Sequence, residues 1–293
     1  MGTSFMNHVA ALYFRLQPKL TEAAFDALIR ERKRLPEQRA LPPRSMNGRR
    51  EDGPDGSLFR FNERADSPCA IFYCHGGSYV NDFSYFHWRL MQKLMNRTGA
   101  AIIASGYRLA PYGTWAEAFR LILPAYIRMA REHPQRKLIL MGDSAGGGLA
   151  AALALELIRQ GERAPDELIL LSPWMDVTMA DPDIKAFQEK DPWLTTGHRA
   201  CGRWWAGETD LRDPRVSPLY GPVEQLRHVT VFAGTREILN PDSVKLFEKL
   251  DPAGGSELII GQGMFHVYPL LPIPEAKAAV EKIVEKIMRE RSR

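Results

Sequence analysis

The stretch KLILMGDSAGGGLAAALALELIRQ, residues 137–160, decides the fold. It begins with an apolar run at 137–141, turns at GDSAG (142–146) and continues as an Ala-rich segment at 145–160. A short apolar run bounded by glycine predicts a buried strand, and an Ala-rich segment predicts a helix. A G-x-S-x-G turn in this context is typical of a nucleophile elbow, which presents its serine on strained backbone. We therefore predict that Ser144 is a catalytic nucleophile.

Strands and helices alternate on both sides of this turn. Further apolar runs lie at 69–74, 100–105, 167–172, 229–233 and 257–260. Helical segments are expected near 84–97, 115–132, 241–250 and 274–290, and the first 45 residues also read as helical, with Thr21 as an N-cap. Unbroken apolar runs fit strands that are buried on both faces. The alternation predicts an α/β fold with a mostly parallel sheet and helices on both faces.

The length and composition set outer limits on the function. The chain has 293 residues, of which 45% are hydrophobic and 25% charged, which suits one large domain with a sizeable core. No apolar run reaches the roughly 18 residues of a membrane span, and residues 1–16 do not read as a signal peptide. Residues 1–50 hold ten Lys/Arg against four Asp/Glu, but no aromatic or binding motif accompanies them. A solvated basic face is therefore expected rather than a nucleic-acid site.

The three cysteines favour a reduced protein. Cys69 and Cys74 fall in one expected strand, which places them roughly 16 Å apart, too far for a disulfide. No CxxC pair accompanies Cys201, so no zinc site is expected. We expect a cytoplasmic protein that binds no metal.

The segment after the strand at 69–74 predicts an oxyanion hole. It reads His75-Gly76-Gly77-Ser78-Tyr79, and two consecutive glycines let the backbone approach a reacting oxygen closely. Acyl transfer needs N–H donors where negative charge develops. The expected donors are Gly76 and Gly77, together with Ala145 after the nucleophile. His75 is expected to hold the loop in shape.

Chain order selects the base. In α/β-hydrolases the triad runs Ser, acid, His, which leaves three histidines after Ser144. His198 lies in an irregular stretch, and His228 precedes a strand and so belongs to the wrong edge of the sheet. His266 follows the strand at 257–260, at the edge where open α/β sheets bind ligands. We therefore predict His266 as the base.

The acid should follow the strand at 229–233. Glu237 is the predicted acid, which would fix the imidazole tautomer and stabilise the imidazolium. Asp242 is the rival, although it is expected to lie inside the next helix. Alternatively, Glu237 has no catalytic role and only pairs with Arg236 on the surface.

Taken together, these residues resemble the hormone-sensitive-lipase-like group of bacterial esterases. The resemblance covers about residues 57–290. Its motifs are His75-Gly76-Gly77, Tyr107-Arg108-Leu109-Ala110-Pro111, Gly142-Asp143-Ser144-Ala145-Gly146-Gly147, Ser172-Pro173-Trp174-Met175-Asp176 and the loop ending at His266. It implies an α/β-hydrolase core that forms a single domain over 1–293, with a helical cap from about 1–45 and about 174–215. It also implies esterase activity without cofactor, and a structural role for Tyr107 to Pro111 in bracing the oxyanion loop. Two positions differ: Ser78 stands where the family usually has a third glycine, and Glu237 where it usually has Asp.

The predicted function is hydrolysis of small carboxylic esters through an acyl-enzyme. Amide or formamide hydrolysis by the same triad is an alternative that the sequence does not separate, and a non-catalytic small-molecule binder is a remote one. Tyr79 and Trp193 are expected to line an apolar substrate pocket. The expected partner is a small ester, with no nucleic acid, and a homodimer is left open.

Overall fold

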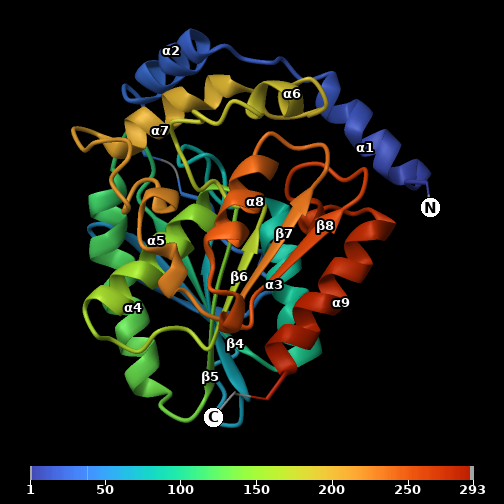
Figure 1. Cartoon of the computed structure of the whole chain (residues 1–293). Helices are drawn as coiled ribbons and strands as arrows, with labels where there is room; N and C mark the ends of the chain where they lie inside the picture. The colour runs from blue at the N-terminus through green and yellow to red at the C-terminus, as the bar shows by residue number, and fades with distance from the viewer. Residues whose placement is uncertain (1, 38, 291–293) are drawn as a thin grey trace.

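The centre of the computed structural model, which describes residues 2–37 and 39–290, is an eight-stranded sheet (Figure 1). Its order is β1-β2-β4-β3-β5-β6-β7-β8. Pairing is antiparallel at β1–β2 and β2–β4 and parallel between all other neighbours, which confirms the predicted α/β class. The strands are β1 (Gly48–Gly53), β2 (Gly56–Phe61), β3 (Cys69–Cys74), β4 (Ala101–Tyr107), β5 (Lys137–Asp143), β6 (Glu167–Leu171), β7 (Val229–Gly234) and β8 (Glu257–Gly261).

The six predicted strands are all present, and their ends differ from the prediction by at most two residues. The hairpin of β1 and β2 was not predicted. β1 has the sequence GRREDG and is largely exposed, so it carries charges where a buried strand would carry apolar residues. Charged side chains are usual on edge strands, because they discourage pairing with other chains. Apolar runs therefore could not predict β1, whereas β2, with the sequence GSLFRF, is fully buried and was missed for another reason.

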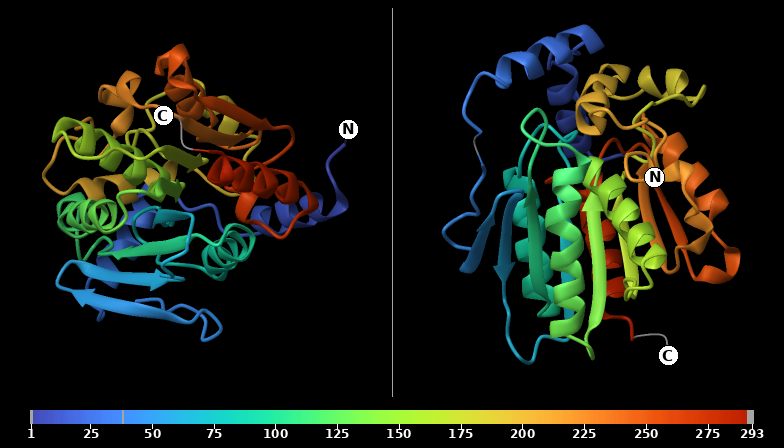
Figure 2. Two further views of the ribbon diagram at one scale, coloured as in Figure 1. Left: turned by 90° about the horizontal axis from the view of Figure 1, so that it is seen from below. Right: turned by 90° about the vertical axis from the view of Figure 1, so that its left-hand side faces the viewer.

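Helices cover both faces of the sheet (Figure 2). One face carries α4 (Trp115–Glu132), α5 (Ala145–Arg159) and α8 (Asn240–Lys249), and the other carries α3 (Tyr85–Thr98) and α9 (Pro274–Met288). Alternate residues of one strand feed the two cores: in β5, Leu138 and Leu140 face the α5 side, whereas Ile139 and Met141 face the α9 side. This alternation explains why the central strands are apolar throughout.

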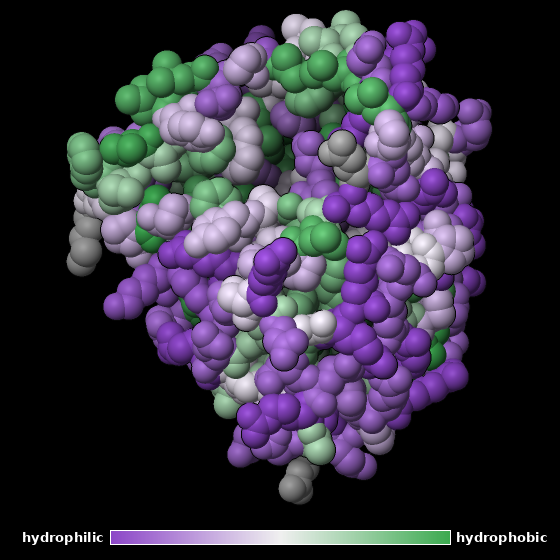
Figure 3. Space-filling model, turned by 180° about the vertical axis from the view of Figure 1, so that it is seen from behind, coloured by the Kyte–Doolittle hydropathy of each residue, from purple (hydrophilic) through white to green (hydrophobic). Residues whose placement is uncertain are grey.

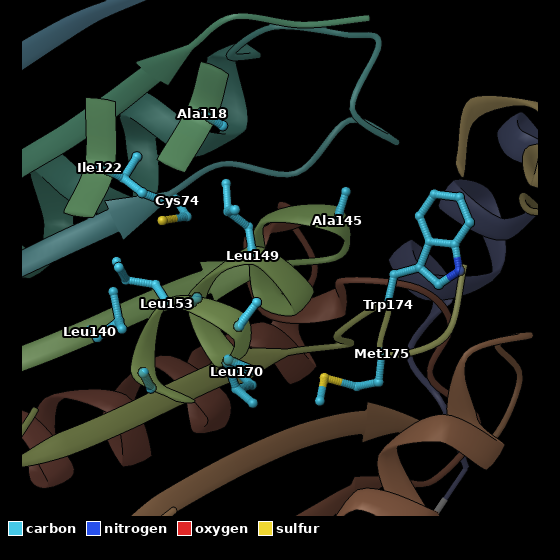
Figure 4. Packing of buried hydrophobic residues seen from close by; sticks show 14 of the residues in the cluster. Cys74, Ala118, Ile122, Leu140, Ala145, Leu149, Leu153, Leu170, Trp174 and Met175 are labelled. Atoms are coloured by element: carbon cyan, nitrogen blue, oxygen red, sulfur yellow. The ribbon is translucent and has the colours of Figure 1, made fainter. Parts of the chain in front are cut away.

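Helix α5 is the best-buried helix of the fold. Its side chains Leu149 and Leu153 lie toward Leu140 of β5 and Leu170 of β6 (Figure 4). Small residues on the rest of the helix allow the backbone to lie close to the strands, so that twelve of its fifteen residues are buried. The packing fixes the N-terminus of α5, where Ser144 stands, against the end of β5.

A group of helices that we call the cap lies over the C-terminal ends of the parallel strands (Figure 1). It consists of α1 (Phe5–Arg15), α2 (Glu22–Arg32), α6 (Ile184–Gln188) and α7 (Arg199–Ala206). Thr21 is the N-cap of α2, as predicted, and its side chain accepts a hydrogen bond from Ala24 N. The expectation of helix throughout the first 45 residues is wrong, because Pro18 lies in the break between α1 and α2 and α2 ends at Arg32.

Candidate active site

The backbone holds Ser144 in an unusual conformation at the turn between β5 and α5. Its φ is 52°, a strained value for a residue with a side chain. Gly142 and Gly146 make the turn possible, because a Cβ at either position would collide with backbone oxygen atoms. The Ser144 N–H donates to Leu171 O at 2.8 Å, which ties the turn to β6. The hydroxyl therefore stands at the N-terminus of α5, where the helix dipole favours negative charge.

His266 reaches this hydroxyl from a loop that follows β8. Its Nε2 lies 2.8 Å from Ser144 Oγ, although 122 residues separate the two in sequence. The loop is anchored by the Val267 N–H, which donates to Ser172 Oγ at 3.0 Å. The imidazole is almost fully buried.

Glu237, which follows β7, orients the other side of the imidazole. Its Oε2 accepts a hydrogen bond from His266 Nδ1 at 3.2 Å, and its Oε1 accepts one from Gly234 N at 2.7 Å. Because Nδ1 donates to the carboxylate, Nε2 of the neutral ring is left as an acceptor for the proton of Ser144. The structure thus brings the predicted serine, histidine and acid into one hydrogen-bonded chain.

Asp242, the rival acid, is placed elsewhere. It lies in the first turn of α8, and its carboxylate accepts hydrogen bonds from Met175 N at 3.2 Å and Asp176 N at 3.0 Å. Burial, reinforced by the neighbouring Asp176, raises the pKa of Asp242 to about 8. Asp242 therefore braces the segment after β6 and does not orient His266.

The other two histidines that follow Ser144 lie on other elements and have other partners. His198 Nδ1 contacts Thr195 O at 2.9 Å within the cap, and burial lowers the pKa of His198 to about 4. His228 immediately precedes β7, at the N-terminal edge of the parallel strands, as expected.

The glycine loop after β3 requires one correction. The Gly76 N–H, an expected oxyanion donor, donates to Asp143 Oδ1 at 3.0 Å and is therefore already used. Within residues 2–37 and 39–290, the N–H groups of Gly77, Ser78 and Ala145 have no hydrogen-bond acceptor in the protein. Three donors near Ser144 thus remain free for a ligand oxygen.

Asp143, whose role the sequence analysis missed, is the centre of a buried network behind this loop. Besides Gly76 N, its carboxylate accepts hydrogen bonds from Tyr73 Oη at 2.6 Å and from His87 Nε2 at 3.1 Å. Burial alone would raise the pKa of Asp143, but the histidine, the hydroxyl and the N–H outweigh it and lower that pKa. Asp143 belongs to the G-x-S-x-G motif, which could have drawn attention to it. No local sequence pattern indicated that His87 has a role in the site.

His75 and Tyr107 support the same loop, as the resemblance implied. The Tyr107 hydroxyl donates to His75 O at 2.8 Å, and the two rings stack with centroids 4.6 Å apart. His75 is fully buried, and burial lowers its pKa. A buried, braced histidine fits the structural role expected for it.

The two expected substrate contacts differ in their surroundings. Tyr79 is buried between Trp174 and Trp205, with the ring of Trp205 parallel at 4.1 Å. This packing joins the cap to the sheet, which corrects the expectation that Tyr79 contacts substrate. Trp193 stays partly exposed and lies edge-on to His266, with ring centroids 5.6 Å apart. Phe14 of α1 stacks on Trp193.

A second buried carboxylate that no motif indicated, Asp191, joins the cap to the acid loop. Its side chain accepts hydrogen bonds from Trp193 N at 2.7 Å and from Ile238 N at 2.8 Å, next to Glu237. Burial raises the pKa of Asp191. Asp191 therefore positions Trp193 over the site.

Two broader features of the described part of the chain bear on function. In residues 2–37 and 39–290, no three His, Cys, Asp or Glu side chains are grouped so that they could hold a metal ion. In the same residues, no helix is both long enough and apolar enough to cross a bilayer.

Comparison with known proteins gives relatives along most of the chain. Residues 71–270 match the family described as alpha/beta hydrolase fold. An esterase of Acinetobacter venetianus is 32% identical over 228 residues, which cover 76% of this chain and 75% of that protein. An acetyl-hydrolase of Streptomyces hygroscopicus is 32% identical and covers 72% of each chain.

Solved structures agree with the sequence relatives. The crystal structure of EstE5 soaked with ethyl alcohol superposes with a TM-score of 0.80 at 26% identity, covering 97% of this chain and 98% of that chain. The hormone-sensitive-lipase homologue EstE7 from a metagenome library has the same fold, with a TM-score of 0.80 at 24% identity, covering 98% of each chain. Together with the two curated relatives, these matches confirm the resemblance noted from the motifs: this chain belongs to the α/β-hydrolase family.

Proposed function

We propose that this chain, a carboxylesterase-type hydrolase by its family, cleaves small carboxylic esters through an acyl-enzyme on Ser144. The observation that carries the proposal is the continuous hydrogen-bonded chain from Ser144 Oγ through His266 to Glu237. It lies beside backbone N–H groups that have no acceptor of their own among the described residues. A nucleophile, a base, an orienting acid and oxyanion donors are the parts that acyl transfer needs.

The reaction would proceed in two displacements. His266 Nε2 takes the Ser144 proton as Oγ bonds to the acyl carbon, and the carbonyl oxygen becomes an oxyanion. The N–H groups of Gly77, Ser78 and Ala145 would stabilise that charge, with Ser78 replacing the expected Gly76. The imidazolium then protonates the leaving alcohol as its bond to the acyl carbon breaks. Water, deprotonated by His266, releases the acid and regenerates the serine.

The substrate class is proposed from the surroundings of His266. Trp193 and Phe14 form an apolar stack beside the imidazole, which favours esters with small apolar groups. Two relatives are named acetyl-hydrolase and ethyl acetate hydrolase, and both names fit short acyl chains. A cytoplasmic location and a single domain over 1–293 stay predictions of the sequence, which left a homodimer open.

Replacement of the nucleophile tests the proposal directly. Ser144→Ala should lower kcat for p-nitrophenyl acetate by on the order of 10⁴–10⁶, the usual effect of removing one member of a triad. Ser67→Ala is a matched control, because Ser67 is also buried but hydrogen-bonds Asn62 O before β3, at the opposite edge of the sheet. Retained activity in Ser144→Ala would overturn the assignment.

Two further assays separate the alternatives. A fluorophosphonate probe should label wild type and Ser67→Ala but not Ser144→Ala, whereas a non-catalytic binder would not react at all. Matched acetate ester and acetanilide substrates should give a much larger kcat/KM for the ester. A preference for the anilide would keep the triad but change the proposed substrate class to amides.

A further inference from the structure

Helix α1 is apolar on two opposite faces. Its inner face packs on the body of the protein, with Ala11 buried and Phe14 stacked on Trp193. Its outer face and C-cap carry a second set of apolar side chains, which are all exposed: Phe5, Met6, Val9, Leu12, Tyr13 and Leu16. At 100° per residue, these six positions fall within an arc of about 120°. The outer set thus forms one continuous stripe and not a scatter of single residues.

The exposure of this stripe is unusually high for apolar side chains. Phe5 is 79% exposed, Leu16 76% and Leu12 58%. Figure 3 shows hydrophobic side chains gathered along the side of the molecule on which α1 lies, with hydrophilic side chains next to them. A contiguous exposed apolar surface on a folded protein indicates a binding surface for a protein or a membrane.

Cations lie directly beside the stripe. Met6 of α1 also lines a groove of about 490 Å³ between α3 and α9, with Arg89, Lys93 and Lys277 in its wall. The groove also holds Arg97, which pairs with Glu281 at 2.7 Å, but none of the other three forms an ion pair with any carboxylate of the described residues. Partial burial and the neighbouring Arg89 lower the pKa of Lys93.

We propose that the outer face of α1 and the adjoining basic groove together bind the surface of an anionic phospholipid membrane. The apolar stripe would enter the boundary between headgroups and acyl chains, and the three unpaired cations would contact lipid phosphates. Both parts are needed, since a single short apolar helix binds weakly without electrostatic attraction. Charge complementarity favours this occupant over a second copy of the chain, because a two-fold contact across α1 would bring two basic grooves together.

The proposal is independent of the chemistry at Ser144. Its stripe lies on the outer face of α1, whereas the contact with the catalytic centre is made by Phe14 on the inner face. Binding to lipid can be measured without turnover. A failure of the lipid proposal would therefore leave the ester hydrolase proposal standing, and the reverse also holds.

Co-sedimentation with vesicles tests the binding. The full chain should bind vesicles of phosphatidylcholine mixed with phosphatidylglycerol far more tightly than vesicles of phosphatidylcholine alone. The triple variant Phe5→Ser, Leu12→Ser, Leu16→Ser should lose at least tenfold in partition. The triple variant Arg89→Gln, Lys93→Gln, Lys277→Gln should lose about a hundredfold, from roughly fivefold for each cation at the surface. Both variants should keep wild-type hydrolysis of p-nitrophenyl acetate, which shows that they fold.

Matched control variants remove an apolar side chain or positive charges from parts of the surface outside the stripe and the groove. Met288→Ser removes an apolar side chain that is 51% exposed at the far end of α9, and Arg64→Gln, Arg131→Gln, Arg159→Gln removes three charges from the body. Both controls should bind vesicles as wild type does. Equal binding by wild type and either test variant would overturn the proposal. So would a concentration-dependent dimer that the Phe5, Leu12 and Leu16 changes abolish, or binding of inorganic phosphate in the groove without binding of vesicles.

Discussion

Two buried histidine–carboxylate pairs stand close to Ser144, and their bonds are nearly equal in length. His266 lies 3.2 Å from Glu237, and His87 lies 3.1 Å from Asp143. Both histidines are at least nine-tenths buried, and both carboxylates accept a further backbone N–H. Geometry within the pair therefore does not distinguish the histidine proposed as the base from a structural one.

The difference lies in the second nitrogen of each ring. His266 presents Nε2 to the hydroxyl of Ser144, a group that can give up its proton during a reaction. His87 uses its Nδ1 to accept the Ser84 N–H at the start of α3, which is a permanent partner. A base needs a free lone pair that faces a reacting proton, and only His266 meets that condition. His87 instead holds Asp143, and through it Gly76, in place.

A third buried carboxylate shows what the histidine partner contributes. Asp242 has two N–H donors but no histidine, and its pKa is raised to about 8 because burial dominates. Asp143, equally buried but next to His87, has a lowered pKa. Asp242 also faces the like charge of Asp176, whereas Asp143 has the ring of His87 and the hydroxyl of Tyr73, so the neighbours of each carboxylate decide the direction in which its pKa moves.

The largest effect is expected from the pair that faces the serine. Glu237→Gln should lower kcat by on the order of 10³–10⁴, because an amide that donates to Nδ1 would select the wrong tautomer of His266. Steady-state hydrolysis of p-nitrophenyl acetate measures the effect. Glu237→Asp keeps the charge on a shorter arm and should recover a large part of the lost rate. If Gln and Asp were equally active, the carboxylate would not orient the base.

A smaller effect is expected from the pair behind the glycine loop. His87→Gln should lower kcat/KM by about tenfold to a hundredfold, less than the 10²–10³ lost when an oxyanion donor is removed outright. The loss should fall on kcat more than on KM, because a loosened loop weakens contacts that form only with the oxyanion. A fluorophosphonate should still label Ser144. A loss confined to thermal stability, with kcat unchanged, would reduce His87 to a purely structural residue.

The residues that the sequence analysis singled out meet at the end of the parallel strands, and there is a physical reason for this. Ser144, Glu237 and His266 each follow an apolar run, and parallel strands bring their ends to one edge. The pattern of apolar residues could not reveal that the Gly76 N–H donates to Asp143, because the local sequence does not determine the direction of an N–H group in a loop. His87 and Asp191 act across the fold from a helix and from the cap, so no spacing along the chain reports their contacts. Strand β1 was missed because its residues are mostly charged, so it contains no apolar run.

The smallest effect, and the sharpest test of the role of the histidine partner, is on stability as a function of pH. Asp242 has a folded-state pKa of about 8, above its unfolded value of about 4, so its contribution to stability is full below the unfolded pKa and is lost as pH rises toward 8. Asp143 has a lowered pKa, so its contribution is present above the unfolded value and is lost as pH falls.

Asp242→Asn should therefore flatten the fall in Tm between the two pKa values of Asp242, because asparagine does not titrate and its Oδ1 can still accept the N–H groups of Met175 and Asp176. Asp143→Asn should leave that fall intact and act only on the acid side, so it is the matched control. Thermal unfolding of wild type and both variants below, between and above these pKa values measures the difference. If the curves of Tm against pH for Asp242→Asn and wild type were parallel, Asp242 would be ionised in the folded protein. Burial and the neighbouring Asp176 would then be insufficient to keep this carboxyl neutral.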